Sequence, residues 1–138
     1  MSNEAMTEAV GGQVVNALFR ALARGDLAGA QEFMHEGLVV HEPPGLPYTG
    51  DWSGRDGFAT LLRRLNSLFS VDLRAFHLVE AADRVVLCAD AVFTCRATGR
   101  ALPMPIVEVY RLEDGKIIDI DVFYKDPAAV AALEGCAS

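Results

Sequence analysis

The stretch Pro103–Asp126, PMPIVEVYRLEDGKIIDIDVFYKD, decides the fold of this chain. Two runs rich in Val, Ile, Phe and Tyr flank Glu113-Asp114-Gly115, and an Asp-Gly step between alternating apolar runs is typical of a β-hairpin. Alternate residues of a strand share a face, so one face of this hairpin is mostly apolar and carries a single carboxylate, Glu108. A carboxyl group in an apolar wall tends to keep its proton, because desolvation disfavours the charged form. Glu108 is therefore the first candidate functional residue.

The composition predicts one folded domain over residues 1–138. The chain is 51% hydrophobic, and 138 residues are enough to bury a substantial core. The net charge is −7, from 12 basic and 19 acidic residues without a basic stripe, which argues against nucleic-acid or membrane-surface binding. No apolar run approaches the ~20 residues of a transmembrane helix.

The amino terminus and the cysteines predict a cytoplasmic protein. The first residues, MSNEAMTEAVGG, are acidic and polar, unlike a signal peptide. Cys88 and Cys95 fall on one predicted strand, beyond disulfide reach of each other, and the three cysteines match no zinc spacing. We interpret all three as reduced, each a small buried hydrophobe or, for Cys136, an inert thiol of the tail.

Helical periodicity precedes strand periodicity along the chain. Apolar spacing predicts three helices, over residues 7–24, 27–34 and 55–69. Asp126-Pro127 begins a short last helix. A short strand over residues 38–42 leads into a Pro- and Gly-rich loop, long enough to act as a lid.

The second half of the chain alternates as a sheet does. Four strands are predicted over residues 71–80, 84–96, 103–112 and 116–124, joined as an antiparallel meander. His77, mid-strand among apolar neighbours, is predicted to be a hydrogen-bonded core histidine. The fold class is α+β: a cone-shaped curved antiparallel sheet wrapped over three N-terminal helices, with a short C-terminal helix.

This order of elements resembles the nuclear transport factor two-like superfamily, which includes ketosteroid isomerases, SnoaL-like polyketide cyclases and limonene epoxide hydrolases. Three phrases carry the resemblance over nearly the whole chain: ALARGDLAGAQEFM, VVHEPPGLPYTGDWSGRDGF and VEVYRLEDGKIIDIDVFYKDP. They are more specific for the fold than for a function. We expect an apolar small-molecule pocket between helices and sheet. The resemblance also implies a homodimer through the outer sheet face, which carries Asp119, Asp121 and Phe123.

The ketosteroid isomerase pattern assigns roles to two glutamates. In that family an acid before a proline, at the end of the first strand, is the general base, and His41-Glu42-Pro43 places Glu42 there. A second acid, kept neutral by its apolar site, hydrogen-bonds the substrate carbonyl, and Glu108 matches it. The family's tyrosine on the first helix is replaced by Leu18. The resemblance therefore implies cofactor-free proton transfer next to the carbonyl of a hydrophobic compound.

The cyclase and epoxide hydrolase pattern fits less well. Those enzymes carry an aspartate at a set distance after the GKI phrase, and this chain has Val122 there. Asp121, next to it, points to the opposite face of the strand. This departure argues against the epoxide hydrolase mechanism and against the acid–base role of the cyclases.

Further residues are candidates for substrate binding, and each has a structural alternative. His41 faces either the pocket or solvent. Tyr48 and Trp52 are either lid residues over an apolar ligand or simple packing of a long loop. Tyr110 and Tyr124 are hydroxyl donors that would replace the missing tyrosine, although Tyr124 could instead close the core against the last helix.

The two glutamates have alternatives as well. Glu42 could be a solvated acid at the start of a loop, and Glu108 could be satisfied by other partners or turned outward by a register shift at Pro105. The chain as a whole could be a non-catalytic small-molecule binding protein of the same fold. No His/Cys/Asp cluster has metal spacing and no glycine-rich phosphate loop follows a strand, so we expect neither a metal nor a cofactor.

Overall fold

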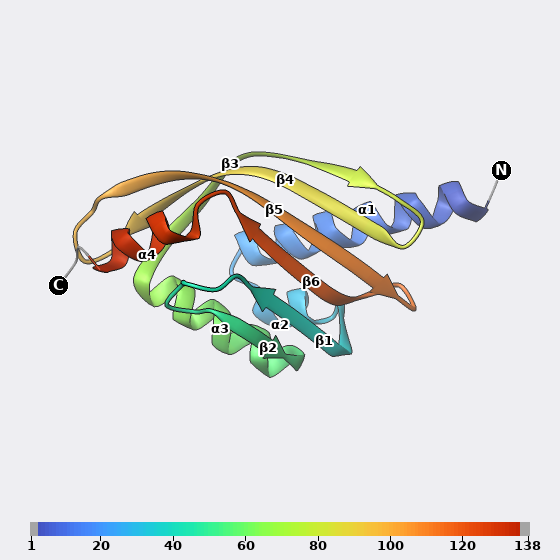
Figure 1. The fold of residues 1–138 in the computed structure, drawn as a ribbon. Helices are drawn as coiled ribbons and strands as arrows, with labels where there is room; N and C mark the ends of the chain where they lie inside the picture. The colour runs from blue at the N-terminus through green and yellow to red at the C-terminus, as the bar shows by residue number, and fades with distance from the viewer. Residues whose placement is uncertain (1–2, 136–138) are drawn as a thin grey trace.

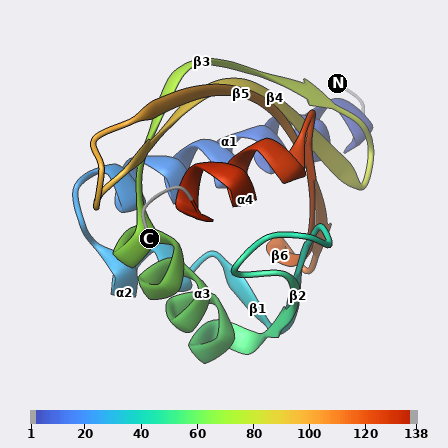
Figure 2. The same ribbon diagram turned by 60° about the vertical axis from the view of Figure 1, so that its left-hand side comes forward.

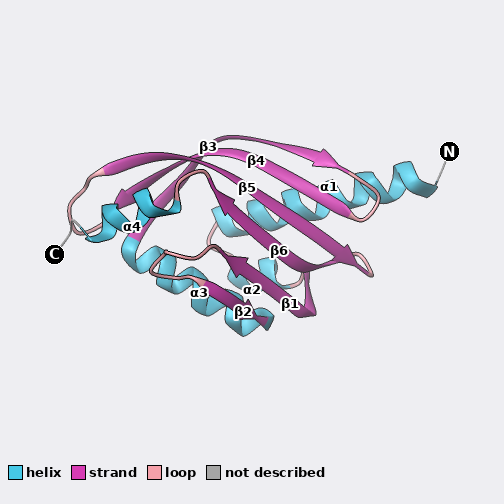
Figure 3. Ribbon diagram, viewed as in Figure 1, coloured by secondary structure: helices cyan, strands magenta, loops and turns pink. Residues whose placement is uncertain are grey.

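A six-stranded sheet and four helices make up residues 3–135, which the computed structural model describes (Figure 1). The helices are α1 (Asn3–Ala23), α2 (Leu27–Gln31), α3 (Gly54–Leu68) and α4 (Pro127–Gly135). The strands are β1 (Met34–Glu42), β2 (Gly50–Ser53), β3 (Phe69–Glu80), β4 (Arg84–Cys95), β5 (Ala101–Glu113) and β6 (Lys116–Tyr124). The predicted α+β class is confirmed, with helices at the N-terminus and a short helix at the C-terminus (Figure 3).

The sheet is mixed, which corrects the prediction of an antiparallel one. Its strand order is β2-β1-β6-β5-β4-β3, and the consecutive strands from β3 to β6 pair antiparallel as predicted. Strand β1, however, runs parallel to β6, with Val40 opposite Ile120. A parallel neighbour needs a long crossover connection, and here α3 and the other strands supply it. The alternation of apolar residues along a strand does not show whether the strand runs parallel or antiparallel to its neighbour.

The central hairpin forms through its Asp-Gly turn. Asp114 and Gly115 both have positive φ, +53° and +75°, between the paired residues Glu113 and Lys116. Two successive positive φ angles define the type I′ turn, whose twist matches that of the flanking strands. A bulge follows in β6 and breaks the strict alternation of the strand, so that Ile117 is fully buried on the same face as Ile120 and Val122.

The sheet curves around the helices (Figure 2). Helix α1 packs against β3 and β4, and α3 packs against β1 and β2. Helix α4 lies within the curve, with Val130 completely buried. The predicted cap of this helix is present, since the backbone N–H of Ala129 donates to the Asp126 carboxylate at 3.2 Å. One hydrophobic core therefore joins all the helices to the concave face of the sheet.

Several local predictions need correction. The loop after β1 contains a short edge strand, β2, which pairs with β1 and carries Trp52. His77 is exposed and not a core residue, because β3 is an edge strand and His77 lies on its outer face, opposite Cys88. Cys95 is buried, whereas Cys136 lies outside the described residues. Within residues 3–135, no helix is long and apolar enough to cross a membrane, and the cytoplasmic location stays a prediction.

Two adjacent glycines let α1 approach the sheet. A Cβ on Gly11 would lie 3.2 Å from Cγ2 of Val85 on β4. A Cβ on Gly12 would collide with the carboxylate of Glu80, at the exposed end of β3. The first neighbour is a fully buried branched side chain, whereas the second is the flexible end of a surface residue. The two positions should therefore respond differently to alanine.

Gly12→Ala is expected to stabilise the protein by about 0.5–1 kcal/mol, because alanine is the better residue in a helix interior and only Glu80 has to move. Gly11→Ala is the matched control, and crowding against Val85 should cancel its gain. The free energies of unfolding come from urea denaturation of both variants. Equal stabilisation at both positions would contradict the close approach of α1 to β4.

Candidate active site

Glu42 and Glu108 reach the concave face of the sheet from the two strands that flank β6. Glu108 pairs with Val122, and His41 pairs with Asp121, so Glu42 lies beside Val122 as well. Neighbouring strands are about 4.8 Å apart, and only the buried side chain of Val122 separates the two glutamate positions. The structure thus brings together the two acids that the sequence singled out.

The Glu42 carboxyl group is poorly solvated. Its Oε1 atom is buried and has no hydrogen-bond partner among the described residues. Burial, and to a smaller extent the negative charge of Glu108, raise the pKa of Glu42 from 4.5 to about 8. A buried carboxyl oxygen without a partner is costly, which makes this atom a plausible contact for a ligand.

Glu108 is held by a tyrosine on its own strand. The Tyr110 hydroxyl donates to Oε1 of Glu108 at 2.5 Å, because residues two apart on a strand share a face. Burial raises the pKa of Glu108, and the hydrogen bond from Tyr110 opposes that rise. Burial and the Glu108 charge also raise the pKa of Tyr110, so the hydroxyl keeps its proton.

A pair of tyrosines lies beside the glutamates. The hydroxyls of Tyr48, in the loop before β2, and Tyr124, at the end of β6, are 2.7 Å apart. The pKa of each is raised, chiefly by burial, and the charge of Glu42 adds to both shifts. These are, with Tyr110, all the tyrosines of the chain. We call the five residues the glutamate–tyrosine cluster: Glu42, Tyr48, Glu108, Tyr110 and Tyr124.

Three of the predicted binding residues, Tyr48, Trp52 and Leu18, lie in or against the hydrophobic core. Tyr48 is 1% exposed and is part of the core, not a surface cover. Trp52 supports it, since the indole Nε1–H donates to the backbone carbonyl of Tyr48 at 3.1 Å. Leu18 is 1% exposed in the same core.

His41 lies apart from the glutamates. Its ring contacts two carboxylates of neighbouring strands, with Nδ1 2.7 Å from Asp51 and Nε2 2.8 Å from Asp119. Val40 and Ile120 are paired and buried on the inner face, so the neighbouring residues His41 and Asp119 point outward, opposite to Glu42. The structure therefore does not bring His41 into the site.

Both ring nitrogens of His41 can donate only when the imidazole is protonated. The hydrogen bond to Asp51, and then that to Asp119, raise the pKa of His41 against the opposing effect of burial. Because the folded-state pKa is raised, the stabilisation is complete below the unfolded pKa of 6.5 and disappears as the pH rises through the folded value. We expect His41→Gln to lower the free energy of unfolding more at pH 5.5 than at pH 9. The difference between the two pH values should be less than about 1 kcal/mol, because the contacts of His41 with Asp51 and Asp119 are partly exposed.

Denaturation curves at the two pH values measure this difference. His77→Gln, on the exposed outer face of β3, is the matched control against which the pH dependence of His41→Gln is measured. An His41→Gln effect that grows with pH would contradict the assigned hydrogen bonds.

The structure also groups residues that sequence spacing could not connect. Ligand atoms of His35, Glu113 and Asp114 lie within 4.8 Å of one another. The three come from the start of β1 and from the hairpin turn, far apart in the chain. All keep surface in solvent, and Nδ1 of His35 accepts the backbone N–H of Gly37. Exposed acidic groupings of this kind are common, and we assign it no function.

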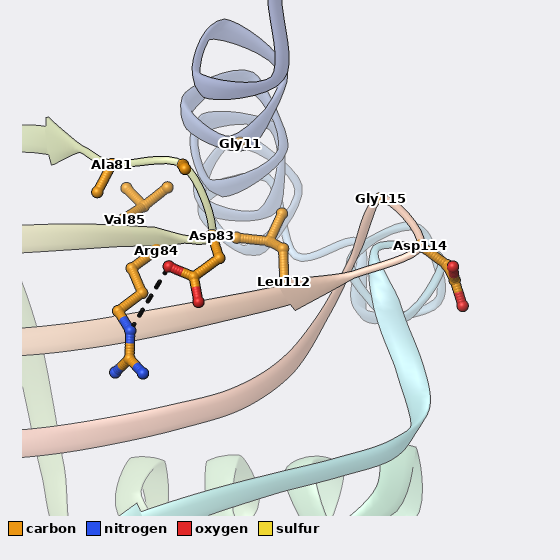
Figure 4. A pocket seen from close by; sticks show the side chains of 9 residues that line it. Gly11, Ala81, Asp83, Arg84, Val85, Leu112, Asp114 and Gly115 are labelled. Atoms are coloured by element: carbon orange, nitrogen blue, oxygen red, sulfur yellow. Dashed lines mark ion pairs between the residues drawn. The ribbon is translucent and has the colours of Figure 1, made fainter. Parts of the chain in front are cut away.

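Two surface hollows lie away from the cluster. One, of about 160 Å³, is formed by Gly11, the β3–β4 turn with its Asp83–Arg84 ion pair, and the β5–β6 turn (Figure 4). The other, of about 270 Å³, lies over β3, β4 and β5 around Ala89. The cluster residues line neither hollow, and the predicted apolar pocket around the glutamates stays a prediction.

Comparison with known proteins supports the fold. Solved structures with the same fold are numerous, with 323 matching chains, so the fold alone does not decide the function. An NTF2-like protein from Burkholderia xenovorans LB400 is 22% identical, with a TM-score of 0.85 over 92% of this chain and 97% of that chain. A candidate polyketide cyclase from Xanthomonas campestris pv. campestris is 20% identical, with a TM-score of 0.80 over 92% and 98% of the two chains.

A third solved structure was obtained in the presence of a small molecule. TerC, co-crystallised with polyporic acid, is 20% identical, with a TM-score of 0.82 over 91% of this chain and 98% of that chain. A comparison with curated proteins gave no significant match. The family model of the SnoaL-like domain matches residues 15–120, a stretch that contains every residue of the glutamate–tyrosine cluster except Tyr124. The chain therefore belongs to the SnoaL-like domain family, and its fold is that of the NTF2-like proteins.

Proposed function

We propose that this protein binds a hydrophobic carbonyl compound and catalyses cofactor-free proton transfer at the carbon next to the carbonyl. The observation that carries the proposal is the pairing of Glu42 and Glu108 in one buried cluster, with Oε1 of Glu42 lacking a partner among the described residues. Two carboxyl groups in such a setting can be held in different protonation states, one as base and one as acid.

Glu42 is the general base in this mechanism. Its carboxylate takes the proton from the α-carbon, the electrons of the broken C–H bond form a C=C bond, and the carbonyl oxygen becomes an enolate. With a pKa of about 8, about one Glu42 in ten is ionised at pH 7, close to the balance that general-base catalysis favours. Return of the proton to the same or another carbon completes an exchange or an isomerisation.

Glu108 is the neutral acid. Tyr110 already donates to Oε1 of Glu108, so Oε2 is the oxygen that can carry the proton toward a ligand. A neutral carboxyl group donating to the enolate oxygen stabilises charge where it develops in the transition state. The raised pKa of Glu108 supports this protonation state.

Access to the cluster supports the proposal. Glu42, Glu108 and Tyr124 each keep part of their surface accessible, whereas Tyr48 and Tyr110 are buried. Glu108 keeps this surface although it lies on a central strand, on the face that the helices cover. Removal of water by a bound apolar ligand would strengthen the electrostatic interactions within the site.

The test uses 2-tetralone, a neutral hydrophobic ketone with acidic α-protons. In D2O, loss of the α-proton signals in the NMR spectrum measures proton transfer without assuming any natural substrate. We expect exchange that is saturable in ketone and proportional to protein concentration. Saturable binding without exchange would overturn the catalytic proposal and favour the second candidate, a small-molecule binding protein, which the co-crystallisation of TerC with polyporic acid also suggests.

We also propose that two copies pair through the outer sheet face. Phe123 is 50% exposed there, opposite Val107 on the neighbouring strand, and Val79 is 54% exposed on the same face. Large exposed hydrophobic residues gathered on one face often mark an interaction surface.

Phe123→Glu is expected to shift the protein from dimer to monomer, because a charge at the centre of an apolar interface would be buried without a partner. Sedimentation velocity over a concentration series measures the change. The control is Asp72→Asn, which changes an exposed residue near the start of the edge strand β3. A wild-type protein that remains monomeric at every concentration would contradict the proposal.

A further inference from the structure

We propose that Tyr124 is the second hydrogen-bond donor of the site, replacing the tyrosine that the first helix lacks, and that Tyr48 is the positioning residue that orients it. The ligand is then a neutral ketone whose oxygen accepts from both Glu108 and Tyr124. This inference rests on the proposed function, which it extends by naming the missing donor.

The tyrosine pair carries one more hydroxyl hydrogen than its mutual hydrogen bond uses. Tyr48 and Tyr124 together carry two, and their mutual hydrogen bond of 2.7 Å uses one. The other has no acceptor among the described residues. Tyr110 has none to offer, because its only hydrogen is donated to Glu108. Among the three tyrosines of the cluster, the Tyr48–Tyr124 pair is therefore the one source of an uncommitted phenolic hydrogen, and Leu18 offers none.

Accessibility decides which member of the pair meets the ligand. Tyr48 is 1% exposed and its backbone carbonyl is fixed by Trp52. Tyr124 keeps accessible surface, and its ring packs on Phe93 with centroids 5.6 Å apart. With Tyr48 donating to Tyr124, the free hydrogen belongs to the hydroxyl that a ligand can reach.

The register places the backbone of Tyr124 close to the positions of both glutamates. Tyr124 follows Val122 by two residues on the same face of β6, and Val122 separates Glu42 from Glu108. Tyr124 pairs with Ile106, which makes it a diagonal neighbour of Glu108, about 7–8 Å away by backbone and within reach of a long side chain. The charges of Glu42 and Glu108 both contribute to raising the pKa of Tyr124, which is consistent with this placement.

The charge of the cluster favours a neutral ligand over an anionic one. Its polar groups are two carboxyls and three phenols, and the groups that shift the pKa values of Glu42 and Glu108 include no cation. An anionic ligand would be repelled by an ionised Glu42, whereas a neutral ketone offers an acceptor oxygen without charge. The enol analogue 2-naphthol is a matching neutral probe, since its oxygen lies where an enolate oxygen would form.

The first experiment compares hydroxyl deletions. Tyr124→Phe should slow 2-tetralone exchange by about 10²-fold at unchanged half-saturation, as for loss of one oxyanion donor, and should weaken 2-naphthol binding. Tyr48→Phe should cost less than about tenfold, because Tyr124 keeps its hydrogen. Thr60→Val removes an exposed hydroxyl from α3 and should change neither. Tyr124→Phe with rate and affinity within twofold of wild type would overturn the inference.

A second measurement needs no variant at Tyr124. The chain has three tyrosines, so labelling their ζ-carbons with ¹³C gives three signals, which Tyr48→Phe and Tyr110→Phe assign by elimination. Saturation with 2-naphthol should move the Tyr124 signal most, and an unmoved signal would overturn the inference. If wild type binds 2-naphthol through Tyr124 but exchanges no protons, the proposed catalysis fails while the donor assignment stands.

Discussion

Glu42→Gln is expected to slow 2-tetralone exchange by at least about 10³-fold, and Glu108→Gln by about 10²- to 10³-fold. The first variant cannot accept the α-proton, because a glutamine amide is not a base at neutral pH. The second keeps a hydrogen-bond donor but loses the acidic hydroxyl that strengthens as the enolate forms. Both substitutions preserve the size of the side chain and so leave the packing around Val122 nearly unchanged.

The matched control is Glu36→Gln, an exposed glutamate on the same strand as Glu42. Initial exchange rates at several ketone concentrations separate loss of turnover from loss of binding. Wild-type rates in either cluster variant would show that the glutamates do not carry the reaction. A loss of binding with no loss of turnover would reassign them to ligand recognition.

Glu42→Gln should also make the protein more stable at alkaline pH. A glutamate whose folded pKa is raised from 4.5 to about 8 destabilises the fold increasingly as the pH rises between these values. A shift of this size corresponds to at most about 5 kcal/mol of stability lost between pH 4.5 and pH 8. The variant has no charge to bury, so its stability should fall much less over that range.

Urea denaturation at pH 5 and pH 9 gives the change in the free energy of unfolding between the two pH values, which is then compared between the variant and wild type. Glu36→Gln again provides the control. Parallel stability profiles for wild type and Glu42→Gln would mean that the Glu42 carboxyl is solvated, and would remove the physical basis of the site. Lower activity with higher alkaline stability in one variant is the combination expected of a functional buried acid.

The hairpin could be predicted from sequence because its signals are local. The Asp114-Gly115 turn and the alternation through β5 fixed which residues face the core, including Glu108. The bulge at Ile117 and the parallel pairing of β1 with β6 depend on tertiary contacts that no short stretch of sequence contains. The edge position of β3 is likewise a property of the whole sheet, and it explains why the mid-strand His77 is exposed.

Some residues of the site could also be predicted from sequence, whereas their tertiary contacts could not. Position on a strand and resemblance to a family pointed to Glu42 and Glu108. The hydrogen bond between Tyr48 and Tyr124 joins residues 76 positions apart, and nothing in their local sequence indicates it. For His41 the sequence left two orientations open, and the carboxylates of Asp51 and Asp119 decided between them.

The most direct test of the account is a ¹³C NMR titration of the Glu42 carboxyl carbon in wild type and in Glu108→Gln. We expect a pKa of about 8 in wild type. In Glu108→Gln the value should remain clearly raised, because burial is the larger cause of the shift and glutamine, like a neutral Glu108, carries no charge. A Glu42 carboxyl that titrates near 4.5 in both proteins would contradict the buried pair of acids on which the proposed function depends.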